Sequence, residues 1–219
     1  MIVTIDGPSG VGKSTVTKVL AARLGFEYLN TGAMYRAVAL AVQRQGVRFA
    51  DEAAVTAALP GVRVEMPPGF VLLNGEDVSA LIHTPELSTG ASEVGVHPAV
   101  RLMLAAAQRA AATGRDMICD GRDQGSFVFP NAECKFFLTA APRVRAARRA
   151  AELAAKGRRV GIEDVMRDQE ERDARDAHRK LAPMAPAADA LVLDTTHLTS
   201  HEVVERLENV VRDLRGCGR

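Results

Sequence analysis

Residues 7–14 read Gly-Pro-Ser-Gly-Val-Gly-Lys-Ser, which fits the pattern G-x-x-x-x-G-K-[ST] of a phosphate-binding loop, or P-loop. Glycines let such a loop curl until its N–H groups point at phosphate oxygens, and the following helix N-terminus adds partial positive charge. Residues 2–5 before it are largely β-branched, as in a strand, and apolar residues at helical spacing begin near Lys13. Strand, glycine loop and helix together predict an ATP or GTP site.

The loop chemistry assigns roles to particular side chains. Lys13 is expected to reach the β- and γ-phosphates, and the Ser14 hydroxyl to ligate Mg²⁺. Asp120, at the end of a predicted strand, would either act on the metal through water or cap the next turn. The residues of this segment predicted to bind ATP are Gly7, Pro8, Ser9, Gly10, Val11, Gly12, Lys13, Ser14 and Thr15.

Beyond the loop, strand and helix patterns alternate, which favours a parallel sheet with crossover helices. Strands are expected at 28–29, 117–119, 135–138 and 190–193. Helices are expected at about 31–46, 98–113, 142–180 with a break at Gly157, and from about residue 200. Residues 50–90 differ, with strand-like runs at 62–66 and 70–73 near the turn signals Pro67-Pro68-Gly69 and Asn74-Gly75. We expect a small, mostly β insertion there.

Composition excludes several classes of protein. The 219 residues are 47% hydrophobic and 25% charged, so neither a disordered nor a membrane-embedded chain is expected. The net charge of +1 and the 4% aromatic content offer neither a basic field nor a base-stacking platform for nucleic acid. The three cysteines lack the spacing of a zinc site and predict reduced thiols.

The same features indicate where the protein works. The N-terminus has no basic region of a signal peptide, and the longest clean apolar run, residues 37–42, is too short to span a membrane. We therefore expect a cytoplasmic protein that binds neither membrane nor nucleic acid. No feature requires a partner, so a monomer is expected.

Several segments together resemble bacterial cytidylate (CMP/dCMP) kinase. They are residues 5–10, 31–36 (Thr-Gly-Ala-Met-Tyr-Arg), 120–123 (Asp-Gly-Arg-Asp) with Phe129-Pro130, 172–179, 182–183 and 186–194. The resemblance runs from residue 2 to about residue 210. It implies transfer of the γ-phosphoryl group of ATP to CMP or dCMP with Mg²⁺, giving CDP or dCDP and ADP.

The resemblance also implies an architecture. It is a P-loop NTPase fold of three α/β/α layers around a five-stranded parallel sheet, within one kinase domain over 1–219. The core would comprise about 1–50, 91–142 and 182–219, with a β-rich monophosphate-binding insertion at 51–90. A helical lid would cover 143–181, with Lys156-Gly157 as a hinge and Arg145, Arg148 and Arg149 on one helical face. Arg148 is assigned to ATP.

Acceptor residues follow from the family's motifs. Arg36, Arg122 and Arg179 would hold the phosphate of CMP through their planar, bidentate guanidinium groups. The family pattern places cytosine recognition at Ser92, Arg101 and Asp123, the sugar at Arg172 and Asp176, and a further CMP contact at Thr31. Lys13, Arg122 and Arg179 are the expected catalytic residues.

Plainer readings of these residues remain open. Arg36 could be a solvated helix charge, Ser92 a helix cap and Asp123 half of a structural salt bridge. Residues 172, 176 and 179 lie at i, i+4 and i+7, so one helix would place them on one face. The sequence departs from the family at two positions, with Asn30 in place of Asp and Gln124 in place of an apolar residue. Neither departure removes a residue that is assigned to the chemistry.

Phosphoryl transfer to a monophosphate needs positioning and charge neutralisation rather than a general base, because the attacking oxygen is already anionic. Placed arginines and only five histidines agree with that demand. A P-loop kinase acting also on UMP, or on another small phosphorylated acceptor, is the nearest alternative. A nucleotide-binding switch is less favoured, because no Asn-Lys-x-Asp base-reading element occurs. A nucleic-acid-binding module built on the Arg-rich helix conflicts with the near-neutral charge.

Overall fold

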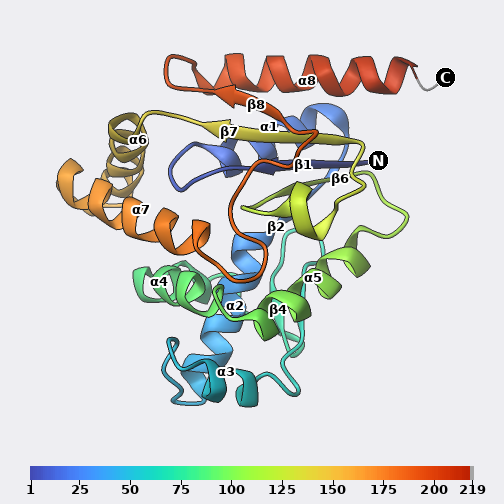
Figure 1. The fold of residues 1–219 in the computed structure, drawn as a ribbon. Helices are drawn as coiled ribbons and strands as arrows, with labels where there is room; N and C mark the ends of the chain where they lie inside the picture. Colours follow the sequence, from blue (N-terminus) through green and yellow to red (C-terminus); the bar gives the residue numbers. More distant parts are fainter. Residues whose placement is uncertain (218–219) are drawn as a thin grey trace. The chain divides into compact units, whose positions relative to one another are not determined.

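A computed structural model describes residues 1–217 of the chain. Its central sheet has five strands in the order β2-β6-β1-β7-β8. β1 pairs in parallel with β6 and β7, and β7 pairs in parallel with β8, which confirms the expected parallel α/β sheet (Figure 1). The strands are β1 (Ile2–Asp6), β2 (Glu27–Asn30), β6 (Met117–Asp120), β7 (Cys134–Thr139) and β8 (Leu191–Asp194).

The helices begin and end at recognisable signals. α1 (Lys13–Leu24) ends at Gly25, which adopts the left-handed conformation typical of a C-terminal cap. α4, α5 and α6 each carry proline in the first turn, where its missing N–H costs nothing. The remaining bounds are α2 (Thr31–Arg44), α3 (Glu52–Ala58), α4 (Pro85–Val94), α5 (Pro98–Ala112), α6 (Pro142–Ala155), α7 (Ile162–Ala177) and α8 (Ser200–Cys217).

The segment expected to be mostly β is mixed, so that expectation was wrong. Its antiparallel sheet is formed by β3 (Val64–Glu65), β4 (Leu72–Leu73) and β5 (Glu76–Asp77), each only two residues long. It also contains α3 and a short 3₁₀ helix, η1 (Leu81–His83). The Asp51 side chain caps α3 and Thr84 caps α4. These N-cap residues, each followed by a glutamate in the first turn, were the missed helix signals.

The chain divides into two compact units. The first contains residues 1–28, 115–178 and those from 182 onward, and the second contains residues 29–114 and 179–181. The sheet strands except the end of β2 belong to the first unit, together with α1, α6, α7 and α8. The second unit contains α2 to α5 and the small antiparallel sheet. The division into core, acceptor insertion and lid has other boundaries and stays a prediction.

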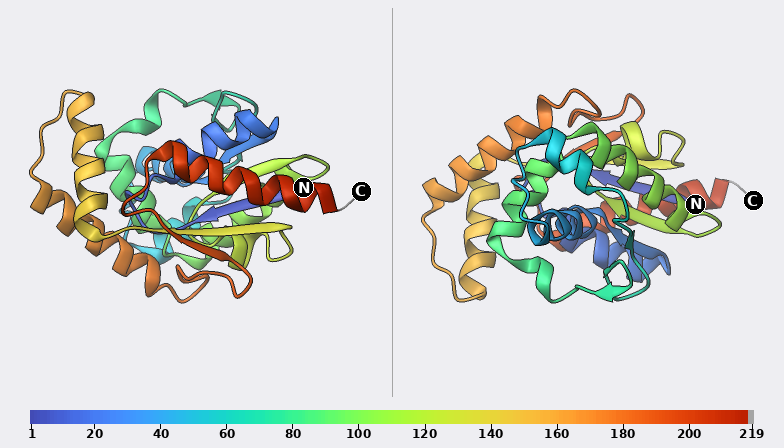
Figure 2. Two further views of the ribbon diagram at one scale, coloured as in Figure 1. Left: turned by 90° about the horizontal axis from the view of Figure 1, so that it is seen from above. Right: turned by 90° about the horizontal axis from the view of Figure 1, so that it is seen from below.

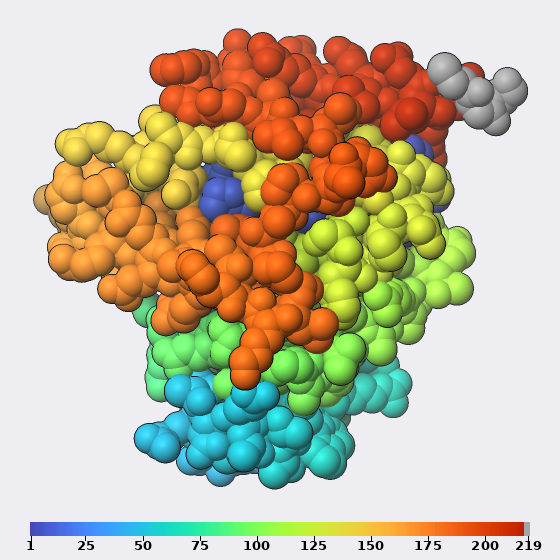
Figure 3. Space-filling model, viewed as in Figure 1, coloured from blue at the N-terminus to red at the C-terminus, as the bar shows by residue number. Residues whose placement is uncertain are grey.

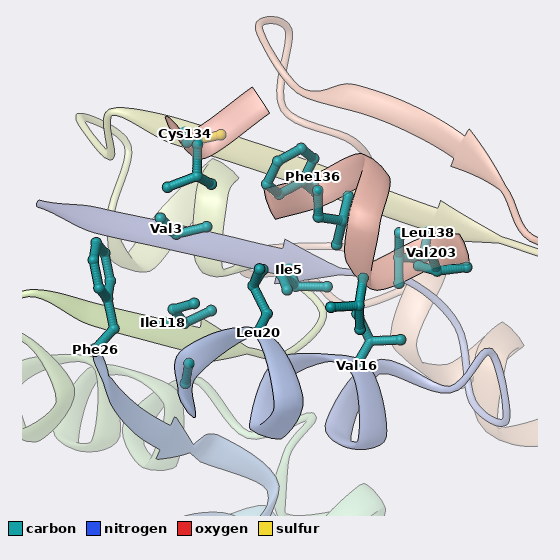
Figure 4. Packing of buried hydrophobic residues seen from close by; sticks show 14 of the residues in the cluster. Val3, Ile5, Val16, Leu20, Phe26, Ile118, Cys134, Phe136, Leu138 and Val203 are labelled. Atoms are coloured by element: carbon teal, nitrogen blue, oxygen red, sulfur yellow. The ribbon is translucent and has the colours of Figure 1, made fainter. Parts of the chain in front are cut away.

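The main hydrophobic core of the first unit packs β1 against helices. Val3 and Ile5 of β1 are fully buried and lie with Leu20 of α1 and Val203 of α8 in one cluster (Figure 4). Burying each such side chain contributes roughly 1.5–3 kcal/mol. This packing holds the end of β1, and therefore the start of the phosphate loop, in a fixed position.

Cys119 and Cys134 are buried and free, as expected of reduced thiols. Burial raises the pKa of the Cys134 thiol to about 12, so it stays protonated and inert at neutral pH. The side chain of Cys217 lies outside the described residues. Among the helices of residues 1–217, none has the length and apolar character needed to cross a bilayer.

Candidate active site

The phosphate loop connects β1 to α1 and is packed tightly at its start. Gly7 has a φ of 143°, and a Cβ there would lie 2.2 Å from the Leu138 carbonyl oxygen. Only glycine fits this position, because both the dihedral angle and the neighbouring backbone exclude a side chain. Atoms of the N-terminal segment (blue) reach the surface in Figure 3 among the yellow and orange segments that follow β7.

Lys13 is buried inside this loop. Its Nζ donates hydrogen bonds to the carbonyl oxygens of Gly7 and Pro8, each at 2.7 Å. Burial lowers the pKa of the Lys13 ammonium well below its usual value, and the nearby positive charges of Arg122 and Arg172 lower it further. Three cationic side chains of the first unit therefore influence one another here, which is the charge arrangement a polyphosphate would neutralise.

Ser14 and Asp120 form a pair of oxygen donors next to the loop. The Ser14 hydroxyl donates to Asp120 Oδ2 at 2.7 Å, and the Tyr28 hydroxyl donates to Asp120 Oδ1 at 3.0 Å. Hydroxyl and carboxylate oxygens are the ligands that Mg²⁺ prefers, directly or through water. The residues present therefore fit a nucleotide-bound Mg²⁺. A role of Asp120 toward the metal through water stays a prediction.

Asp6, at the end of β1, holds the loop that carries Arg122 and Asp123. Its two carboxylate oxygens accept the backbone N–H groups of Gln124 at 2.9 Å and Gly125 at 2.8 Å. These residues begin a short π-helix, η2 (Gln124–Val128), with the buried Asp123 at its N-cap. Burial raises the pKa of the Asp6 carboxyl to about 7, although both backbone hydrogen bonds favour its ionised form. Sequence reasoning missed this residue.

Two of the predicted acceptor residues contact each other. Arg122 Nε donates to Asp176 Oδ2 at 2.9 Å, and Asp176 is almost completely buried. Arg172 lies on α7 with Asp176, as the i, i+4 spacing predicted. Arg179 does not share that helix face, because α7 ends at Ala177. The chain turns away there and passes through Ala182, which has a positive φ of 52°.

A cavity of about 390 Å³ lies beside the phosphate loop in the first unit. Arg148 forms part of its wall, with Nη2 donating to the carbonyl oxygens of Thr195 at 2.7 Å and Leu198 at 3.1 Å. Arg148 Nη1 also donates to Thr195 Oγ1 at 3.1 Å. Residues from the phosphate loop, α1, α6 and the start of α8 complete the lining: Gly10, Val11, Gly12, Thr15, Val16, Arg149, Glu152, Thr199, Ser200 and Val203. The sequence predicted only part of this lining as ATP-binding, namely the residues of the phosphate loop together with Thr15 and Arg148.

In the second unit, α2 begins with the motif that carries Thr31 and Arg36. The Asn30 side chain accepts the N–H of Ala33 at 3.1 Å, so it caps the helix as an aspartate would. Thr31 is buried in the first turn. Arg36 is half-buried, and its Nη1 would lie 3.4 Å from a Cβ added at Gly32. The departure at Asn30 therefore preserves the local backbone.

The cytosine-reading candidates of the second unit are buried. Arg101 is 1% exposed, donates from Nη1 to the Gly95 carbonyl oxygen at 3.1 Å and lies 5.9 Å from the centre of the Tyr35 ring. Ser92, on α4, is buried, and its hydroxyl has no hydrogen-bond partner among the described residues. Arg179 belongs to the same unit, with Nη2 3.6 Å from a Cβ added at Gly95. Ser92 does not cap its helix; Thr84 does.

The structure thus brings together two groups of predicted residues. The first unit places the phosphate loop with Lys13 and Ser14 near Arg122, Asp123, Arg172 and Asp176. Thr31, Arg36, Ser92, Arg101 and Arg179 belong to the second unit. Roles of individual residues toward ATP and CMP stay predictions.

Comparison with known proteins identifies the family. The profile described as "Cytidylate kinase" matches residues 3–213. A cytidylate kinase from Solibacter usitatus is 45% identical over 221 residues, covering 100% of this chain and 95% of that protein. One from Chromobacterium violaceum is 45% identical over 206 residues, covering 94% and 93%. The solved structure of a gluconokinase from Sinorhizobium meliloti has a TM-score of 0.50 at 15% identity, covers 98% of this chain and 94% of that one, and supports the fold alone.

Proposed function

The chain belongs to the cytidylate kinase family, and we propose that it transfers the γ-phosphoryl group of ATP to CMP or dCMP. The products are ADP and CDP or dCDP. The observation that carries the proposal is the buried Lys13 inside a complete phosphate loop, with Arg122 and Arg172 close enough to lower its pKa. Such a cluster binds the charge that is shared between donor and acceptor phosphates in the transition state.

The first unit supplies the donor side of the reaction. The backbone of residues 7–15 binds the α- and β-phosphates, and Lys13 moves from the carbonyl oxygens it now contacts to the β- and γ-phosphates. The cavity beside the loop takes the base of ATP, since its apolar walls at Val11, Val16 and Val203 suit a planar ring. Arg148 supports this cavity through the carbonyl groups of Thr195 and Leu198.

Ser14 and Asp120 would hold Mg²⁺ that arrives with ATP. When bound, the ion neutralises charge on the β- and γ-phosphate oxygens. Tyr28 orients Asp120 by its hydrogen bond at 3.0 Å. The Ser14 hydroxyl donates to Asp120 Oδ2 at 2.7 Å, so the two side chains are close enough to hold one ion together, directly or through water.

The residues proposed for CMP follow the family's motifs. Arg36, Arg122 and Arg179 bind its phosphate, Arg172 and Asp176 its sugar, and Ser92, Arg101 and Asp123 its cytosine, with Thr31 as a further contact. Arg122 is already oriented by Asp176, so its guanidinium needs little reordering. The buried Ser92 hydroxyl would gain a partner from the base, and a base that cannot pair it leaves a buried polar group unsatisfied.

The α6–α7 region acts as a lid that excludes water from the transferred phosphoryl group, since water would otherwise accept it. Gly157, with a φ of 78°, allows the chain to turn after α6. We further propose that the enzyme works in the cytoplasm and as a monomer, because no feature of the sequence requires a partner.

A coupled ADP-release assay tests the proposed reaction. The enzyme is supplied with Mg-ATP and with CMP, dCMP, UMP, AMP or GMP in turn. Fast turnover with CMP and dCMP alone supports both the reaction and the cytosine-reading residues. Equal use of UMP would keep the kinase and contradict the roles of Ser92, Arg101 and Asp123. The absence of acceptor-dependent turnover would contradict the proposed function.

A further inference from the structure

A carboxylate from a distant helix lies on the phosphate loop. The backbone N–H of Ser9 donates to Asp173 Oδ1 at 2.9 Å, although the two residues are 164 positions apart in the sequence. Asp173 comes from α7, and both residues belong to the first unit. Backbone N–H groups of a phosphate loop ordinarily face an anionic ligand, so a protein carboxylate at this position calls for a physical explanation.

Arg145 completes the contact from α6. Its Nη1 donates to the Ser9 carbonyl oxygen at 2.9 Å and forms an ion pair with the second carboxylate oxygen of Asp173. The Arg145 and Asp173 side chains are only 9% and 14% exposed. One ion pair therefore satisfies both backbone polar groups of Ser9. An exposed pair of this kind would contribute little, whereas this shielded pair is tied to the backbone of the binding loop.

Packing next to Ser9 shows that α6 and α7 are fitted closely to the loop. A Cβ added at Gly10 would lie 2.9 Å from the Arg145 carbonyl oxygen and 2.2 Å from Gln169 Nε2. α6 and α7 also lie side by side in both views of Figure 2. The glycine at position 10, with its φ of 75°, therefore permits both the turn of the loop and the approach of the two helices.

The charges explain why both partners are required. A lone carboxylate here would repel the phosphates of ATP, and a lone buried guanidinium would lose its hydrogen-bonded counterion. Together they are neutral and fix both backbone groups of Ser9. Fixing the loop before ATP arrives removes conformational entropy that binding would otherwise cost.

We propose that Asp173 is a positioning residue for the phosphate loop and that Arg145 neutralises it, so that the pair holds the loop in its ATP-binding conformation. The proposal rests on the proposed function only in naming ATP as the ligand of the loop. It concerns the donor site and leaves cytosine recognition unchanged.

The test compares Asp173→Asn, Arg145→Gln, the double variant and the wild type. Asp168→Asn is the matched control, because Asp168 is an exposed aspartate on the same helix. Calorimetry measures the Kd for Mg-ATP without acceptor, and the ADP-release assay gives KM for CMP. We expect Asp173→Asn to weaken Mg-ATP binding about 10-fold while KM for CMP changes less than about 3-fold. Arg145→Gln should weaken it more, because it leaves the carboxylate facing the phosphates.

The double variant tests whether Arg145 acts by neutralising Asp173. It should bind Mg-ATP more tightly than Arg145→Gln alone, because removing the carboxylate removes the repulsion. The proposal would be overturned if Asp173→Asn bound Mg-ATP as tightly as Asp168→Asn, or if the double variant bound it no more tightly than Arg145→Gln.

Thermal unfolding identifies a variant that fails to fold. If Asp173→Asn does so, the double variant, which buries no unpaired charge, is compared with Arg145→Gln. A wild type that binds Mg-ATP but does not phosphorylate CMP would contradict the proposed function alone.

Discussion

The phosphate loop and the acceptor residues of the second unit are encoded in different ways. The loop pattern consists of eight consecutive residues, 7–14, which follow β1 and run into the first turn of α1, and it can be read directly from the sequence. The residues of the second unit predicted to bind the acceptor come from α2, α4, α5 and the turn after α7, with Thr31 and Arg179 at the extremes. A site built from consecutive residues can be recognised from their spacing alone. A site built from residues far apart in the sequence can be recognised only from a family pattern or from the fold.

The two regions also differ in how their polar groups are satisfied. Lys13 donates to two loop carbonyl oxygens, and Ser9 is held through both of its backbone groups by Asp173 and Arg145. In the acceptor region the buried Ser92 hydroxyl has no hydrogen-bond partner among residues 1–217. The Lys13 ammonium and the backbone of Ser9 are therefore held by the protein itself, whereas we predict that the Ser92 hydroxyl finds its partner in CMP.

The largest effect is expected for Lys13→Ala. Losing the only lysine of the loop should lower kcat on the order of 10³-fold, because its charge stabilises the transferred phosphoryl group. Circular dichroism should show a folded protein, and the ADP-release assay measures the loss. Lys18→Ala on the exposed side of α1 is the matched control. Unchanged turnover in Lys13→Ala would refute the assignment of the loop.

A substitution in the backbone of the loop should strongly lower the free energy of unfolding. Gly7→Ala places a Cβ 2.2 Å from the Leu138 carbonyl oxygen at a φ of 143°, so we expect a loss of more than about 4 kcal/mol in the free energy of unfolding. Urea denaturation measures it. Gly216→Ala, where a Cβ would meet no atom within 4 Å among the described residues, should be neutral or slightly stabilising. A near-neutral Gly7→Ala would mean that β7 does not constrain the loop.

The buried Asp6 should make stability depend on pH. Its folded-state pKa of about 7 lies above the ordinary value of 3.8, so between these values the folded protein holds a proton that the unfolded chain has lost. Stability from this group is therefore fully present below about pH 4 and is lost as pH rises through 7, by roughly 4 kcal/mol in all, of which roughly 3 kcal/mol is lost between pH 5 and pH 8. Urea denaturation at pH 5 and pH 8 measures the difference. Asp6→Asn should abolish it, and an identical pH dependence in both proteins would contradict this origin.

The smallest effect is expected on the acceptor side. Ser92→Ala should raise KM for CMP about 10-fold through one lost hydrogen bond to the base, while KM for ATP stays constant. Ser88→Ala is the control, because Ser88 on the same helix already donates to the Thr84 carbonyl oxygen. The ratio of kcat/KM for CMP to that for UMP should fall only in Ser92→Ala. Equal effects of the two variants on CMP would show that Ser92 is structural.

Much of the fold followed from the sequence because its signals are local. Residues 2–6 form a strand through their β-branched run, and Gly25 ends α1. The insertion was misread because strand-like residues at 62–66 and 70–73 suggested longer strands, while the cap at Asp51 marked a helix. Arg179 was placed on a helix face because spacing alone does not reveal that α7 ends at Ala177.

By itself, the sequence determined a nucleotide-phosphate site, since the loop pattern states its own chemistry within eight residues. The tertiary structure alone decided that Asp173 and Arg145 hold Ser9, and that Asp6 holds the N–H groups of Gln124 and Gly125. The physical reason is distance along the chain. A carboxylate that satisfies a backbone group 164 residues away leaves no periodicity, spacing or composition by which it could be recognised before the chain is folded.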